Sequence, residues 1–228
     1  MYLNEHCTGY PTEWINTAKY DTTGLIFNGI GCLFWVVCYI VLIRTIVKKK
    51  FVEMPFFIAA GNLAWEFIWS VFYHPDTGIL FSLSYQSAFL IDCFIFYYVI
   101  KYGADYIKIP EIKKNWKLIC IGLLLGWIPL NFFFVYNNLD TCIGGISGYI
   151  LNIIISVLYP WVMLQTGAQH YSKLVAWCKM LGTGLISVSM FIFYPDNYFV
   201  QTLAVLVLIL DCYYIYLLNK KKKALEQI

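Results

Sequence analysis

Seven apolar runs dominate the chain and are separated by short polar segments. Each run is about 20 residues long, enough for a helix to cross a hydrocarbon core of roughly 30 Å. This pattern predicts an all-α membrane protein with seven transmembrane helices. The runs cover approximately residues 25–47, 55–73, 83–102, 118–136, 146–165, 174–194 and 199–218.

The polar segments divide the chain into three parts. Residues 1–24 are polar and contain Trp14 and Tyr20, which predicts a segment outside the bilayer that lies on the membrane surface. They lack the short apolar core of a cleavable signal peptide. Residues 25–218 form the predicted seven-helix domain, and residues 219–228 form a basic cytoplasmic tail.

Positive charge is distributed unevenly between the two ends of the predicted bundle. Arg44 and fourteen lysines fall in or beside the loops after the first, third, fifth and seventh runs, whereas only Lys19 lies on the other side. The positive-inside rule therefore predicts an outside or lumenal N-terminus and a cytoplasmic C-terminus. Charged residues make up 13% of the chain, compared with about a quarter in soluble domains. We expect membrane lipid, and no nucleic acid, among its partners.

Two short segments resemble each other. Residues 90–97 (LIDCFIFY) in the third run match residues 209–216 (ILDCYYIY) in the seventh, and a Tyr, Pro and Asp turn precedes each run. The match is consistent with a parallel duplication in a 3+1+3 arrangement, of the kind found in several transport folds. Shared membrane composition is the alternative explanation.

Three carboxyl groups lie in the middle of apolar runs, at Glu66, Asp92 and Asp211. A charged carboxylate there costs about 2.5–3.5 kcal/mol on insertion scales. Since Lys179 is near the end of its run, we expect no cationic partner, and desolvation then favours the protonated acids. Protonated carboxyl groups in a dry site act as general acids. Alternatively, each acid only joins neighbouring helices by polar contacts.

The second run places several functional side chains on one helical face. Asn62, Glu66, Trp69 and Tyr73 follow the spacing i, i+4, i+7 and i+11, which predicts the wall of a pocket with Asn62 hydrogen-bonded to Glu66. Aromatic faces stabilise cations, so Trp65 beside the acid could serve such a wall. The alternative is that Trp65 faces lipid. The expected substrate contacts are Asn62, Trp65, Trp69, Tyr73, Asp92, Phe96 and Tyr214.

The eight cysteines include no C-x-x-C pair, and no two aspartates are adjacent. We therefore expect no metal site, no diphosphate–magnesium site and no cofactor. Only Cys7 and Cys142 lie in segments that could meet outside the membrane. A disulfide between them and two free thiols are both open.

Residues 62–68 (NLAWEFI) together with Leu210, Asp211 and Cys212 resemble the integral membrane terpene cyclases of fungal meroterpenoid and indole-diterpene pathways. The resemblance extends over essentially the whole chain. It implies metal-free, protonation-initiated cyclisation of a prenyl chain, often at a terminal epoxide, with Glu66 and Asp211 as the catalytic acids. The implied substrate is hydrophobic and prenylated. This chain has Trp69 where the family pattern has a tyrosine.

Two other classes remain open. A small-molecule transporter with a midplane acidic site is favoured by the duplication, but Glu66 has no acidic counterpart in the second half, where Ile186 or Ser187 would align. A sensory receptor has less support, because no lysine lies midway along the seventh run to hold a retinal Schiff base.

Overall fold

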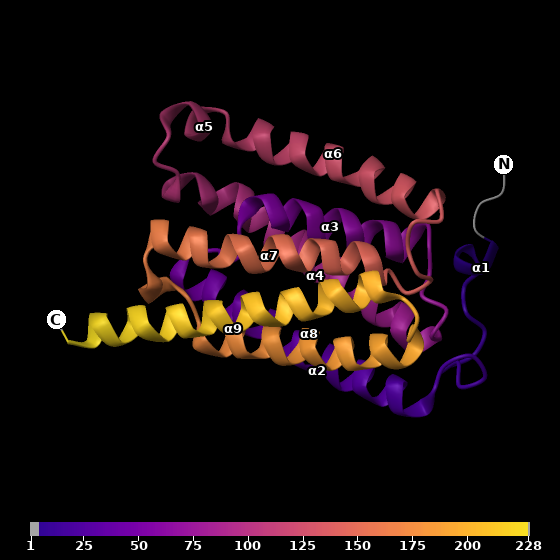
Figure 1. Cartoon of the computed structure of the whole chain (residues 1–228). Coiled ribbons are helices and arrows are strands. Elements are labelled where there is room, and N and C mark those ends of the chain that lie inside the picture. Colours follow the sequence, from indigo (N-terminus) through magenta and orange to yellow (C-terminus); the bar gives the residue numbers. More distant parts are fainter. Residues whose placement is uncertain (1–4, 228) are drawn as a thin grey trace.

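The computed structural model describes residues 5–227, which fold into helices and connecting loops without a strand (Figure 1). Its elements are α1 (Glu5–Thr8), α2 (Thr22–Lys49), α3 (Phe56–Val71), α4 (Ile79–Tyr102), η1 (Gly103–Tyr106), α5 (Pro110–Lys114), α6 (Trp116–Tyr136), α7 (Gly145–Thr166), η2 (Ala168–His170), α8 (Lys173–Phe193) and α9 (Tyr198–Glu226).

Six of these helices, α2, α4, α6, α7, α8 and α9, are long and apolar enough to cross a membrane. The seventh predicted span, α3, is apolar but has only 16 residues. At 1.5 Å per residue it extends about 24 Å, less than the hydrocarbon thickness. The prediction of seven membrane-spanning helices is therefore confirmed in part, as six candidate spans and one shorter apolar helix.

Local chemistry explains where the helices begin and end. The Asp21 side chain accepts hydrogen bonds from the amides of Thr23 and Gly24 at the start of α2, and Lys50 ends that helix in the left-handed conformation. Helix α3 starts directly after Pro55, which has no amide hydrogen to leave unpaired. The basic residues after position 218 continue α9 as helix to Glu226.

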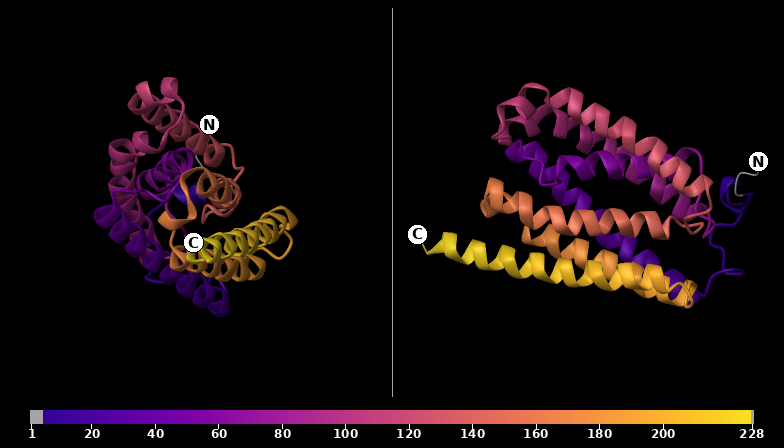
Figure 2. Two further views of the ribbon diagram at one scale, coloured as in Figure 1. Left: turned by 90° about the vertical axis from the view of Figure 1, so that its left-hand side faces the viewer. Right: turned by 45° about the horizontal axis from the view of Figure 1, so that its top comes forward.

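The helices pack so that α3 is enclosed by its neighbours. Helix α3 lies against α4 and α6, α2 runs along α8, and α9 packs on both α7 and α8 (Figure 2). Gly31 and Gly182 allow the backbones of α2 and α8 to approach, since a Cβ on Gly31 would lie 2.8 Å from the Gly182 carbonyl oxygen.

The predicted duplication finds mixed support in this packing. Helix α3 packs on α4 as α8 packs on α9, which a parallel 3+1+3 duplication requires. However, α7 packs extensively on α9, whereas its proposed counterpart α2 makes only slight contact with α4. The duplication remains a prediction.

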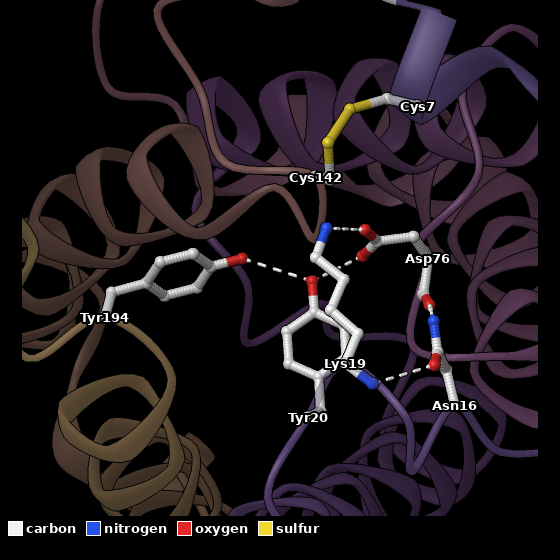
Figure 3. A network of polar contacts seen from close by, with 7 residues as sticks. All are labelled: Cys7, Asn16, Lys19, Tyr20, Asp76, Cys142 and Tyr194. Atoms are coloured by element: carbon white, nitrogen blue, oxygen red, sulfur yellow. Dashed lines mark hydrogen bonds and ion pairs between the residues drawn. A yellow bond between two sulfur atoms is a disulfide. The ribbon is translucent and has the colours of Figure 1, made fainter.

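The N-terminal segment covers one end of the bundle. A disulfide joins Cys7 to Cys142, which confirms the pairing considered from the sequence. The Asp76 carboxylate, in the loop between α3 and α4, accepts hydrogen bonds from Lys19 and from the Tyr20 hydroxyl, and the Asn16 amide donates to the Asp76 carbonyl (Figure 3). These contacts attach the segment to the α3–α4 and α6–α7 loops.

Candidate active site

A cavity of about 450 Å³ lies among α2, α3, α4, α7 and α8. This volume is within the range of roughly 300–1,000 Å³ that is typical of small-molecule sites. Apolar and aromatic side chains make up most of its wall, which suits a hydrophobic ligand. The polar groups on the wall include Asn28, Tyr39, Asn62, Glu66, Asn152 and Thr183.

Glu66 contributes the one carboxyl group that residues 5–227 place on the cavity wall. The side chain is buried, and its Oε2 atom has no hydrogen-bond partner among the described residues. No ion pair within the described part of the chain involves Glu66. Burial without a cation favours the neutral, protonated form, which can donate a proton into the cavity.

Asn62 lies on the wall one turn from Glu66, but its contact differs from the expected one. Its amide donates to the Tyr39 hydroxyl at 3.4 Å, so the predicted hydrogen bond from Asn62 to Glu66 is wrong. Asp92 is buried beside these two side chains, behind the cavity wall, and neither of its carboxyl oxygens has a hydrogen-bond partner among residues 5–227. Together, Tyr39, Asn62, Glu66 and Asp92 form what we call the acid cluster.

The aromatic residues of α3 separate into two groups. Trp65 lines the cavity, and its indole donates to the Ser147 hydroxyl at 2.7 Å, so it does not face lipid. Trp69 and Tyr73 are fully buried but lie off the cavity wall, in a cluster with Cys7 and Val135. The predicted wall therefore ends at Glu66, because the N-terminal segment and α6 enclose the next turns of α3.

Asp211 has a cationic partner, contrary to the expectation from the sequence. Its carboxylate lies 2.6 Å from the Lys179 ammonium and accepts a hydrogen bond of 2.7 Å from Ser156. Both charged side chains are 3% exposed. This triad joins α7, α8 and α9 next to the cavity, whose wall includes Ile155 but not Asp211.

Two other predicted contacts also lie behind the wall. Phe96 is buried in the largest apolar cluster, and Tyr214 packs against Tyr159 with ring centroids 5.4 Å apart. The structure adds wall residues beyond those expected from the sequence, including Tyr149, whose hydroxyl lies 2.7 Å from that of Ser187. The polar side chains of Tyr149 and Asn152, at i, i+3 spacing in an apolar run, are the available signal in the sequence.

Asp140 is a further buried acid, in the loop before α7. It accepts hydrogen bonds from the amides of Thr141 and Ile146 and from Ser147. Burial raises the pKa of Asp140 to about 6, while these hydrogen bonds lower it. Its position just ahead of Gly144 and Gly145 is typical of a helix-capping acid. Among the described residues no three His, Cys, Asp or Glu side chains come together as metal ligands.

Comparison with known proteins gives one family model and several relatives. The model of Pyr4-like transmembrane terpene cyclases matches residues 11–224. Pyr4-family terpene cyclase mfmH from Annulohypoxylon moriforme is 26% identical over 194 residues, 83% of this chain and 67% of that protein. Terpene cyclase dpasB from Apiospora sacchari is 24% identical over 171 residues, 75% of this chain and 69% of the relative.

A third relative matches over a shorter stretch. Terpene cyclase ascF from Acremonium egyptiacum is 30% identical over 114 residues, which cover 50% of this chain and 39% of that protein. The match therefore spans well under half the length of the Acremonium protein. No solved structure matches the chain.

Proposed function

This chain belongs to the Pyr4-like transmembrane terpene cyclases, and we propose that it protonates the terminal epoxide of a prenylated substrate and guides carbocation cyclisation without a metal. The protein is a multi-pass integral membrane protein. The observation that carries the proposal is Glu66, a buried carboxyl without a cation that opens onto an apolar cavity beside Trp65.

The reaction begins when the Glu66 carboxyl transfers its proton to the epoxide oxygen. The carbon–oxygen bond breaks, positive charge develops on carbon, and a neighbouring double bond of the prenyl chain attacks it. Trp65 presents an aromatic ring to the cavity and stabilises the cation, while the apolar wall excludes water. Loss of a proton from the final cation balances the first step, so the product is an isomer of the substrate.

The rest of the acid cluster supports the donor. Loss of the Glu66 proton leaves a carboxylate near Asp92, and two buried acids so close favour keeping one proton between them. We therefore assign Asp92 a supporting role, in which its negative charge would favour return of a proton to Glu66. Asn62 donates a hydrogen bond to the Tyr39 hydroxyl at 3.4 Å, which links α3 to α2 on the wall beside Glu66.

Asp211 assists from behind the wall. Its ion pair with Lys179 and its hydrogen bond from Ser156 hold α7 against α8 and α9. Ile155 and Asn152 of α7 line the cavity next to this triad, so Asp211 shapes the site by positioning α7. This is a positioning role, whereas the family resemblance implies that Asp211 is one of the two catalytic acids.

Incubation of membranes containing the protein with an epoxidised prenyl-aromatic compound tests the proposal. We expect a cyclised product of unchanged mass, identified by mass spectrometry and NMR. Glu53→Gln is the matched control for changes at Glu66, because Glu53 is also a buried glutamate but lies away from the cavity wall. Uptake of the compound into vesicles without a new product would instead indicate a transporter and overturn the proposal.

A further inference from the structure

A chain of hydrogen bonds connects the loop before α7 with the aromatic wall of the cavity. The Trp65 indole nitrogen donates to the Ser147 hydroxyl oxygen at 2.7 Å. The Ser147 hydroxyl in turn donates to the Asp140 carboxylate. Asp140 is itself fixed by the amides of Thr141 and Ile146, each at 2.8 Å. The indole is thus linked through one serine to a carboxyl group held by backbone amides.

Glycine backbone and a tyrosine confine the same indole on its other sides. Gly144 has a φ of +66°, and a Cβ there would lie 2.5 Å from the Trp65 ring and 2.8 Å from Trp69. A side chain at this position would be both strained and blocked. The Tyr85 ring lies 5.3 Å from the Trp65 ring, and its hydroxyl donates to the Ile143 carbonyl at 3.0 Å.

We propose that Asp140 and Ser147 are positioning residues that orient the Trp65 indole and enrich its ring for stabilising the carbocation. This inference rests on the proposed cyclase function. Hydrogen bonds in series polarise one another, so a carboxylate behind Ser147 makes its oxygen a stronger acceptor. A strong acceptor at the indole N–H shifts electron density into the ring, whose face attracts a cation.

The expected consequence concerns the fate of the cation. An indole released from Ser147 would lose both its orientation and its polarisation. Intermediates would then survive less well, and a larger fraction would be captured early, either by water to give an alcohol with release of a proton or by early proton loss. Proton delivery by Glu66 would continue, because neither hydrogen bond that links Trp65, Ser147 and Asp140 involves the Glu66 carboxyl group.

Ser147→Ala tests this directly. We expect kcat to fall about tenfold with KM nearly unchanged, and we expect more incompletely cyclised or hydrated product. Ser147→Thr should restore the product pattern, since it retains a hydroxyl. Trp65→Phe should resemble Ser147→Ala, and adding Ser147→Ala to Trp65→Phe should have no further effect. Ser172→Ala, which removes a serine from the start of α8, is the control for lost helix capping.

Two results would overturn the inference. One is a wild-type product pattern in Ser147→Ala, and the other is additive losses in the double variant. If the wild-type protein makes no cyclised product, the proposed function fails and the indole is examined in the purified protein. Ultraviolet resonance Raman difference spectra, with Trp65→Phe identifying its signal, should show a weaker indole hydrogen bond in Ser147→Ala. An unchanged signal would show that the Trp65 indole does not depend on Ser147 as its acceptor, and it would exclude the proposed hydrogen-bond chain.

Discussion

The carboxyl group of Glu66 has an unpartnered oxygen and opens onto the cavity, so its substitution tests a single proton. Glu66→Gln retains the shape but removes the acidic proton, and we expect binding to persist while turnover falls by at least about 10²–10⁴-fold. Glu66→Asp withdraws the acid by one methylene and should retain partial activity. Rates of product formation and substrate affinity measure both effects. Cyclisation by Glu66→Gln at nearly the wild-type rate would contradict the assignment.

The Asp211–Lys179 pair gives a second prediction at the scale of single residues. Asp211→Asn leaves the Lys179 ammonium buried and unpaired, which should cost about 3–5 kcal/mol of stability. Because an unpaired Lys179 would displace α7, which carries Asn152 and Ile155 of the wall, it should also lower turnover more than Asp92→Asn does. The double variant Lys179→Met/Asp211→Leu removes both charges and should recover stability and most activity, measured by thermal unfolding and turnover in detergent. A stable but inactive double variant would mean that Asp211 takes part in the chemistry.

Glu66 and Asp211 show which features of the site can be predicted from the sequence. Glu66 could be identified because an acid within an apolar run must face a cavity or a partner. The ion pair of Asp211 could not, because it requires the relative rotation of α7, α8 and α9 about their axes. The sequence places Lys179 six residues after Lys173, the first residue of α8. It does not show which neighbouring helix the Lys179 side chain faces.

At the scale of elements, the loop between α2 and α3 predicts a pH dependence of stability. Glu53 in this loop is buried and accepts the amide hydrogen bond of Ser172, at the start of α8, at 3.1 Å. Burial raises the pKa of Glu53 from 4.5 to about 8, opposed by the Ser172 bond and by Lys222 and Lys49. Since the folded protein binds this proton more tightly than the unfolded chain does, stability should decline as the pH rises from about 4.5 to 8.

Glu53→Gln should remove this part of the decline, because a neutral amide keeps the shape without the buried charge. We expect its thermal midpoint to exceed that of the wild type at pH 8–9 and to approach it near pH 5. Glu111→Gln, at an exposed glutamate of α5, is the matched control and should follow the wild-type curve. Parallel curves for Glu53→Gln and the wild type would refute the prediction.

The ends of the helices are easier to predict from the sequence than the neighbours against which each helix packs. The apolar runs that end near Lys50 and begin near Pro55 and Asn197 locate these helix ends to within a few residues, whereas α9 continues past its run to Glu226. Trp69 and Tyr73 share the helical face of Glu66, as the period predicts, but the sequence does not show that the N-terminal segment and α6 cover these turns of α3. Lipid and protein interior are both apolar, so the sequence does not distinguish the sides of an all-apolar helix.

For the whole molecule, the distribution of basic residues predicts the orientation in the membrane. The N-terminal segment and the C-terminal end of α9 lie at opposite ends of the bundle (Figure 1). A tag ahead of residue 1 should be protected from a cytoplasmic protease, and a tag after residue 228 should be cleaved. The disulfide at the N-terminal end agrees with an oxidising exterior. Cleavage of the first tag alone would reverse the assignment of every loop.

The shape of the cavity predicts how a hydrophobic substrate reaches Glu66. Several wall residues are also exposed at the surface of the bundle, among them Val36 of α2, 48% exposed, and Leu83 of α4, 42% exposed. Helices α2 and α4 make only slight contact, so the cavity opens between them toward the region that hydrocarbon would occupy. A prenyl chain dissolved in the bilayer would enter there without crossing water.

Ser87→Trp tests this route, because Ser87 is an exposed wall residue on α4 and an indole there would narrow the opening. We expect kcat/KM to fall mainly through a higher KM, since the acid cluster is unchanged. Leu90→Trp is the matched control: Leu90 lies on the same helix, is 69% exposed and is absent from the wall. It should leave the kinetics unaltered. Equal effects of the two tryptophans on kcat/KM, or none from either, would place the substrate's path elsewhere.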